Sequence, residues 1–190
     1  MTKPSSSSPE PTIESERLSI RSLCSADEEL YCGLYMDAEV MRFVGEPLPR
    51  ARAAGGLRKT LELMSRTPFQ RRVVVLIDRA SQQPIGISSI HIVDAKRGCA
   101  EVGMLLKPTS HARGLARECS VALLTQAFTR PQVNELIAHS AVGNDVIERL
   151  LTDLGFIRGA AVPASKDRPP RTRWSVGREA WSKRSKVDCE

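Results

Sequence analysis

The fold of this chain of 190 residues is decided by the stretch Ala100-Glu-Val-Gly-Met-Leu-Leu-Lys-Pro-Thr-Ser-His-Ala-Arg-Gly-Leu-Ala-Arg-Glu118. It predicts a buried strand, then a turn with a glycine at Gly114, then the start of a helix. The first N–H groups of a helix have no partner within the helix, and together with the helix dipole they attract anions. The stretch therefore predicts a binding site for a ligand that carries phosphate.

Strand and helix patterns continue on both sides of this stretch. The sequence Ser25-Ala-Asp-Glu28 matches a capping box at the start of a helix, and Gly155 is placed at a left-handed helix end. Strands are predicted at 17–23, 72–78, 85–93, 99–106, 135–140, 156–162 and 173–176, and helices at 30–35, 51–64, 115–130 and 146–154. This order favours an α/β (α+β) fold, with a mixed central sheet of about seven strands flanked by about four helices.

Length and composition fit one folded domain. Hydrophobic residues make up 41% of the chain and charged residues 26%, which is an ordinary globular composition. No apolar run approaches the roughly 20 residues that span a bilayer, so we expect no membrane partner. We predict a flexible N-terminal tail over 1–11, a single domain over 12–182 and a basic C-terminal tail over 183–190.

The cysteines, histidines and net charge limit the remaining classes of function. The five cysteines and three histidines show no metal-type spacing, so we expect no metal site, and we interpret the cysteines as reduced thiols of a cytoplasmic protein. The net charge is +6, and residues 163–190 hold eight basic and four acidic side chains. This segment either attracts an acidic partner or is a solvated basic tail. The second interpretation is favoured, and no nucleic-acid partner is expected.

Several segments, in order along the chain, resemble the motifs of one family. They are Glu16-Arg17-Leu18-Ser19-Ile20-Arg21 ("ERLxxR"), Asp27, the stretch from Asp37 to Val44, Glu101-Val-Gly103 ("ExG"), the loop His111–Glu118, the stretch from Asn144 to Gly155-Phe156 ("N…GF") and Trp174–Trp181. On these motifs the chain resembles the GCN5-related N-acetyltransferases (the GNAT family), and within them the RimJ/RimL-type branch of ribosomal-protein alanine acetyltransferases. The resemblance implies the GNAT fold, with central strands that splay apart.

The resemblance also implies acetyl-CoA, or another acyl-CoA, as the donor of an acyl group. The backbone of the loop would cradle the pyrophosphate, and the end of the central strand would offer backbone groups to the pantetheine arm. Asn144 would hydrogen-bond this arm or cap the following helix, and both roles can hold at once. The implied cofactor residues are Leu105, Leu106, Lys107, His111, Ala112, Arg113, Gly114, Leu115, Ala116, Arg117 and Asn144.

Acyl transfer to an amine needs a group that removes a proton from the amine. His139 is the first candidate base, because it lies on the strand that faces the expected gap and histidine titrates near neutral pH. The alternative is a hydrogen-bonded structural histidine. Glu101 is the second candidate, against the favoured alternative that it points away, and His91 is interpreted as structural or as lining the acceptor site. Ile147 and Leu151 occupy positions where relatives often carry a hydroxyl side chain, so both usual proton donors are absent.

The expected function is transfer of an acetyl or related acyl group from acyl-CoA to a primary amine. An α-amine titrates near 8 and a lysine near 10.4, so an α-amine is the easier acceptor. The acceptor is a protein N-terminus or a small-molecule amine, and its pocket is expected between residues 35 and 67 and within 163–173. The protein is expected to be a monomer or a homodimer. The alternative is a non-catalytic module of the same fold that binds acyl-CoA as a sensor or scaffold.

Overall fold

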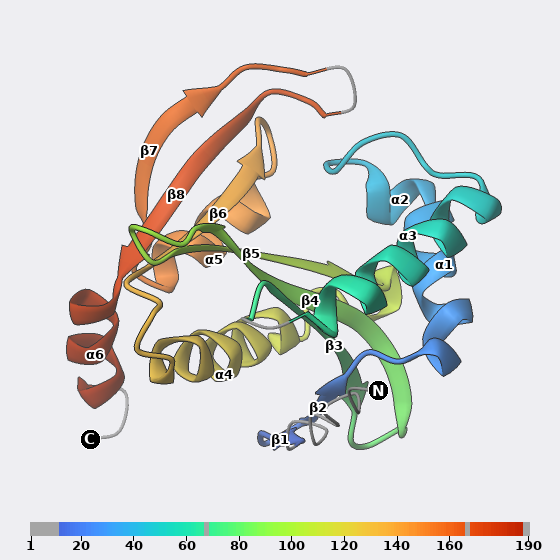
Figure 1. Ribbon diagram of the computed structural model, residues 1–190, viewed down its shortest axis with the longest axis horizontal. Helices are drawn as coiled ribbons and strands as arrows, with labels where there is room; N and C mark the ends of the chain where they lie inside the picture. Colours follow the sequence, from blue (N-terminus) through green and yellow to red (C-terminus); the bar gives the residue numbers. More distant parts are fainter. Residues whose placement is uncertain (1–11, 67–68, 166–167, 188–190) are drawn as a thin grey trace, which may run out of the picture.

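One mixed sheet runs through the molecule in the order β1-β2-β3-β4-β5-β6-β8-β7 (Figure 1). The computed structural model describes residues 12–66, 69–165 and 168–187. Its strands are β1 Ile13–Glu14, β2 Leu18–Ser22, β3 Arg71–Asp78, β4 Gln83–Asp94, β5 Cys99–Leu106, β6 Glu135–Ala141, β7 Ile157–Val162 and β8 Arg171–Gly177. All seven predicted strands are present, and the mixed α/β architecture is confirmed.

The helices are α1 Glu28–Met36, α2 Ala38–Met41, α3 Arg50–Met64, α4 Leu115–Thr129, α5 Asp145–Asp153 and α6 Arg178–Val187, with short 3₁₀ turns at Ser25–Asp27 and Pro108–Ser110. The prediction missed β1 and α2, which are too short to show a periodic pattern. It also missed α6, so the boundary placed at residue 182 falls inside a helix. The tail predicted over 1–11 lies outside the described residues. None of the described helices is long and apolar enough to cross a membrane.

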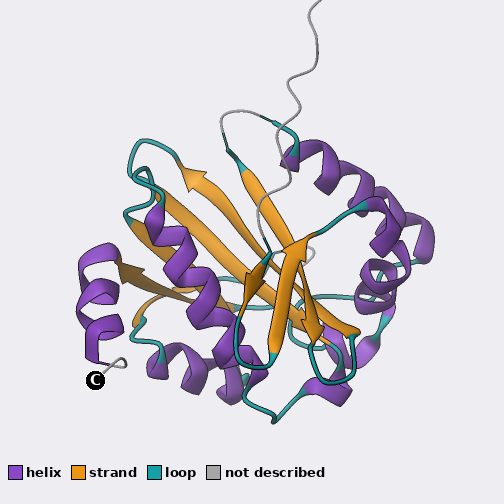
Figure 2. Cartoon of the chain, turned by 90° about the horizontal axis from the view of Figure 1, so that it is seen from below, coloured by secondary structure: helices purple, strands orange, loops and turns teal. Residues whose placement is uncertain are grey.

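Helices cover both faces of the sheet (Figure 2). We call one face the α4 face; α4 and α5 pack there on alternate residues of β5, among them Ala100 and Val102. We call the other the α3 face; α1 and α3 pack there on Val73, Val75 and Leu105. The β-branched run of β3 is buried because its alternate residues enter cores on opposite faces.

The two central strands separate, as predicted. β5 and β6 are parallel and pair only over three positions, from Cys99 with Glu135 to Glu101 with Ile137. Beyond these positions β5 stays paired with β4 as far as Leu106, and β6 stays paired with β8 as far as Ala141. The sheet therefore opens between β5 and β6 while each strand keeps its outer partner.

The entry to α1 differs from the prediction. The capping box uses Cys24 and Asp27, one residue earlier than the predicted pair Ser25 and Glu28. Asp27 is placed by Arg21, whose Nη1 and Nη2 donate to its two carboxylate oxygens at 2.8 and 2.7 Å, while the Cys24 N–H donates at 2.9 Å. A bidentate arginine holds this buried carboxylate more firmly than a capping contact alone would.

The Arg21–Asp27 pair predicts a pH-dependent contribution to stability. Burial alone would raise the pKa of Asp27, but the hydrogen bonds from Arg21 and the Cys24 N–H outweigh it and lower the pKa. The contribution is therefore present above the unfolded pKa of about 3.9 and is lost as the pH falls below it. We expect Asp27→Asn to lower the free energy of unfolding by about 1–3 kcal/mol at pH 7.

Urea unfolding at pH 7 and at pH 3.5 measures this effect. The difference between the wild type and Asp27→Asn should shrink at the lower pH. Asp153→Asn, at an exposed position of α5, is the control and should stay within about 0.5 kcal/mol of the wild type. A deficit of Asp27→Asn that is equal at both pH values would contradict the assignment.

Candidate active site

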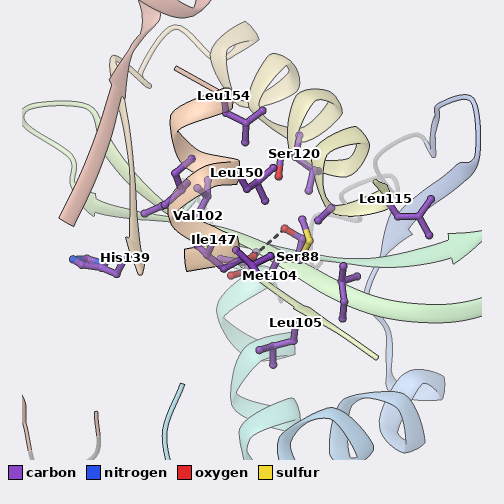
Figure 3. Close-up of a pocket in the computed structure, with 18 of the residues that line it drawn as sticks. Ser88, Val102, Met104, Leu105, Leu115, Ser120, His139, Ile147, Leu150 and Leu154 are labelled. Carbon is purple, nitrogen blue, oxygen red and sulfur yellow. Dashed lines mark hydrogen bonds between the residues drawn. The ribbon is translucent and has the colours of Figure 1, made fainter. Parts of the chain in front are cut away.

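A cavity of about 560 Å³ lies where β5 and β6 separate, and residues from both faces of the sheet line it. On the α4 face, apolar side chains of β5, α4 and α5 surround it, among them Val102, Met104, Leu150 and Leu154 (Figure 3). On the α3 face, α2 and the residues after it contribute Glu39, Val40, Arg42, Phe43 and Val44. The opening in the sheet thus connects two differently covered sides of the molecule.

One edge of the cavity is the loop at the start of α4. Gly114 is the N-cap with φ +74°, no side chain caps the helix, and Ala112 also has a positive φ of +57°. Left-handed residues next to ordinary ones turn successive N–H groups toward one point, which suits an anion. A non-glycine residue in this region costs roughly 1–3 kcal/mol, and such strain concentrates at binding sites. The loop predicted from the sequence to bind phosphate therefore has the geometry for it.

Ion pairs with the sheet hold this loop in place. Arg17 donates from Nε to Glu118 Oε2 at 2.7 Å and from Nη1 to the Arg113 carbonyl at 2.8 Å. The Arg113 Nη1 donates to Asp78 Oδ2 at 2.8 Å and holds the pKa of that carboxyl below its ordinary value. Arg17, the first arginine of the "ERLxxR" motif, is thus a positioning residue for the loop, a role that the sequence did not reveal.

Most of the predicted cofactor residues border the cavity. Leu105, Leu106, His111, Ala112, Gly114, Leu115, Ala116 and Asn144 line it, whereas Lys107, Arg113 and Arg117 are not among its described lining residues. Arg113 turns toward Asp78. Asn144 caps α5, accepting the Ile147 N–H at 3.4 Å, and lines the cavity as well. Both of the roles expected for Asn144 are compatible with this position.

The two candidate bases lie together on the α3 face. His139 Nδ1 is 3.4 Å from Glu101 Oε1, and His91 Nε2 is 3.8 Å from Glu101 Oε2. The parallel pairing of Glu101 with Ile137 places His139 two residues further along β6, on the same face. His139 lines the cavity, and its imidazole is turned away from the apolar group on the α4 face (Figure 3). Glu101 is not among the described lining residues.

The carboxylate between the two histidines is ionised at neutral pH. The neighbouring His139 has the largest effect on the pKa of Glu101 and lowers it, against the opposite effect of burial. Burial lowers the pKa of His91, and Glu101 partly opposes this effect. Among the described residues, no group of three or more potential ligands is placed to hold a metal ion. The arrangement therefore offers His139 as a proton acceptor at the cavity, with an ionised carboxylate beside it.

Two further sets of lining residues had no individual role assigned from the sequence. The residues around α2 fall within the broad region where the acceptor pocket was expected and within the motif stretch from Asp37 to Val44, but the motif alone did not place them at the cavity. Arg72 of β3 is 5% exposed and lines the cavity. The sequence did offer one signal for Arg72. It stands at the start of a β-branched run that enters two cores, and arginine is rarely buried.

Comparison with known proteins agrees with this architecture. The family model described as the acetyltransferase (GNAT) domain matches residues 17–157, which is more than half of the chain. An uncharacterized N-acetyltransferase p20 of Bacillus licheniformis is 24% identical over 146 residues, which cover 76% of this chain and 82% of that protein.

Solved structures share the fold. A RimL ribosomal L7/L12 α-N-protein acetyltransferase in complex with coenzyme A superimposes with a TM-score of 0.76 at 12% identity, over 90% of this chain and 99% of that one. A spermidine N-acetyltransferase of Vibrio cholerae in complex with CoA and spermine gives a TM-score of 0.75 at 18% identity, over 88% and 99%. An acetyltransferase of Bacillus anthracis gives 0.73 at 19% identity, over 89% and 99%.

The cluster on the α3 face predicts a shift in the titration of His91. Glu101 raises the pKa of His91, whereas burial and the nearby charges of Arg71 and Arg168 lower it. Replacing Glu101 by glutamine removes the one raising influence, so we expect the pKa of His91 to fall further in Glu101→Gln. NMR titration of the imidazole resonances measures it, with the resonances of His111 as the internal control. An unchanged or higher pKa of His91 would show that Glu101 does not act on it.

Proposed function

The chain belongs to the GNAT acetyltransferase domain family, and from this premise we propose that it transfers an acyl group from acetyl-CoA, or a related acyl-CoA, to a primary amine. The observation that carries the proposal is the single cavity that reaches from the anion-binding loop, through the opening between β5 and β6, to His139. A donor held on the α4 face and an amine on the α3 face would meet in that opening.

The residues present fit coenzyme A. The N–H groups at the start of α4 suit a pyrophosphate, and the apolar walls from α4 and α5 suit the pantetheine arm. When bound, acyl-CoA supplies a thioester whose carbonyl carbon is open to attack by an amine. The opened edge of β5 adds backbone groups, since beyond Glu101 that edge has no β6 partner. Backbone N–H groups of this kind can stabilise negative charge on a carbonyl oxygen.

We assign the proton transfer to His139, with Glu101 as its positioning residue. His139 borders the cavity on the α3 face, and Glu101 stands 3.4 Å behind it. His139 would take the proton of the attacking amine, and the negative charge of Glu101 would stabilise the resulting imidazolium. This arrangement resembles that of the carboxylate behind the histidine in other acyl-transfer sites. The arrangement favours His139 as the base over a purely structural role. It gives Glu101 the role of supporting His139.

The leaving group needs little help from the chain. Ile147 and Leu151 line the cavity with apolar side chains and offer no proton. A free thiol titrates near 8.5, so the thiolate is a tolerable leaving group at neutral pH. An α-amine is also the less demanding acceptor. The fold is shared with an α-N-protein acetyltransferase and with a spermidine N-acetyltransferase, so a peptide N-terminus and a small amine both stay candidates as the acceptor, and membership of the RimJ/RimL-type branch remains a prediction.

The proposal is tested by thiol release from acetyl-CoA in the presence of amines. Peptides with free N-termini and small polyamines form the panel, and mass spectrometry identifies the acylated product. We expect release that depends on the amine, and we expect His139→Ala to slow it by at least about tenfold at neutral pH. Affinity for CoA should not change in this variant, because His139 lies on the α3 face and the donor is expected on the α4 face.

Two outcomes would overturn parts of the proposal. An unchanged rate in His139→Ala would remove this residue from the mechanism. Tight binding of acetyl-CoA without transfer to any amine of the panel would favour the alternative, a non-catalytic module that binds acyl-CoA. The absence of a proton donor at Ile147 and Leu151 is consistent with that alternative.

The phosphate site makes a separate prediction. Ala116 is the second residue of α4 and lines the cavity. An aspartate there suits the helix dipole and so spares the fold, but it repels a pyrophosphate. We expect Ala116→Asp to weaken CoA binding by at least about tenfold, which is about 1.4 kcal/mol. Calorimetry measures it, with Thr125→Asp at an exposed position of the same helix as the control. Equal affinities of the two variants would place the pyrophosphate elsewhere.

A further inference from the structure

The α3 face of the sheet carries a half-buried arginine that the acyl transfer described above does not use. In β8, Trp174 and Val176 enter the core on the α4 face, so Arg171 and Arg173 project from the α3 face. The Nε of Arg171 is buried and has no hydrogen-bond partner among the residues that the structure describes. Arg173 is instead held by Glu135 at 3.2 Å. A guanidinium nitrogen removed from water without a partner is unfavourable, and an anionic ligand would relieve this cost.

The register of the sheet places Arg171 beside the cavity. Arg171 pairs with Ala141 of β6, and His139 pairs with Arg173. Ala141 and His139 both line the cavity. Diagonal neighbours on adjacent antiparallel strands lie about 7–8 Å apart, which is therefore the separation of the Arg171 and His139 backbones. A molecule can contact both side chains if a short chain joins its amine to an anionic group.

Two further arginines make this side of the sheet basic. Arg71 of β3 pairs with His91 of β4, which in turn pairs with Glu101 of β5. Arg168 precedes β8 in the chain. In addition to burial, the charges of Arg71 and Arg168 lower the pKa of His91, so both guanidinium groups lie near this imidazole. With Arg171, they bring three positive charges to the surroundings of the single carboxylate of Glu101.

The opposite wall of the cavity, at α2, does not compensate this excess. Glu39 and Arg42 both line the cavity there, so one acid and one base balance among the described lining residues of this segment. Arg42 lies over the ring of Phe43, with its guanidinium carbon 5.0 Å from the ring centre. The excess of positive charge on the α3 face therefore comes from the side of β8 and β3.

This distribution of charge distinguishes between the candidate acceptors. A polyamine would bring further ammonium groups toward Arg71, Arg168 and Arg171 and would be repelled by them. A carboxylate in the same place would form charge-assisted hydrogen bonds, which are stronger where water is partly excluded. The α3 face therefore favours an acceptor that combines an amine with an anionic group.

We propose that the acceptor is an amine joined by a short chain to a carboxylate, with the amine at His139 and the carboxylate on Arg171. Free amino acids and peptides with an acidic second residue share this chemistry. The proposal rests on the proposed function and names its acceptor class. The reaction is unchanged: the amine nitrogen bonds to the thioester carbonyl carbon, the C–S bond breaks, CoA leaves as the thiolate, and the amine proton goes to His139. The carboxylate of the acceptor is not altered.

Matched pairs of acceptors test the proposal. The amidated peptides Ala-Asp-Ala and Ala-Asn-Ala differ in one carboxylate, and alanine and alaninamide test a free amino acid. Because a carboxylate raises the pKa of a nearby amine, kcat/KM with acetyl-CoA is expressed per concentration of neutral amine. We expect the carboxylate to raise kcat/KM at least about fivefold in one pair or both, and the pair concerned identifies the source. Smaller ratios in both pairs, or spermidine as the best acceptor, would overturn the proposal.

Variants locate the preference. Arg171→Gln should reduce it to less than about twofold, while the uncharged member of the pair is acylated as by the wild type. If Arg171→Gln does not fold, Arg168→Glu decides: this position is exposed, and the reversed charge on the same face should abolish the preference. Arg149→Gln and Arg149→Glu make the same changes at an exposed position of α5 and should leave the preference intact. A preference that survives the deciding variant would overturn the role of these arginines.

The outcomes also separate this proposal from the function on which it rests. If no amine of either pair, nor spermidine, increases thiol release from acetyl-CoA, the proposed function fails, and the acceptor class fails with it. If both members of each pair are acylated equally well, transfer to amines stands and only the carboxylate-bearing acceptor is wrong.

Discussion

The structure depends on the early separation of two parallel strands. β5 and β6 pair over three positions and then diverge, while each stays bonded to its outer neighbour. An unpaired strand edge inside a protein has to be matched by another group, since buried N–H and C=O groups are costly without partners. The opening therefore demands an occupant, and an extended arm with amide groups can satisfy the edge as a further strand would. The cavity that spans the sheet follows from this one interruption.

The other constraint is the strained loop before α4. Ala112 and Gly114 both have positive φ values, and the loop ends in an uncapped helix. The contacts Arg17–Glu118, Arg17–Arg113 and Arg113–Asp78 join it to β2 and β3. The contacts of Arg17 link the start of β2 to this loop across about a hundred residues of sequence. Together with the Arg113–Asp78 pair, they hold the strained loop at the edge of the cavity.

The two faces of the opening carry different chemistry. On the α3 face, the ionised Glu101 lies between His91 and His139, and His139 borders the cavity. On the α4 face, apolar side chains of β5, α4 and α5 line the cavity. In the proposed function, the sheet itself therefore separates the proton acceptor from the apolar wall along which the donor would lie. This separation allows each to be tested with its own variants and measurement.

The sequence by itself determined the seven main strands, the helices α1, α3, α4 and α5, and the glycine-containing loop before α4. These features follow from local periodicity, and a glycine at a left-handed helix start can be recognised without its neighbours in space. Motifs also pointed to Glu101, His139 and Asn144. Only the tertiary structure decided that Asp27 pairs with Arg21 at the 3₁₀ turn before α1, that Arg17 holds the loop, that α2 borders the cavity, and that Arg72 lines it. Each of these depends on contacts between residues far apart in the chain or on which face of a strand a side chain occupies. Local sequence patterns do not reveal long-range contacts or the face that a side chain occupies, because strand register and packing determine both.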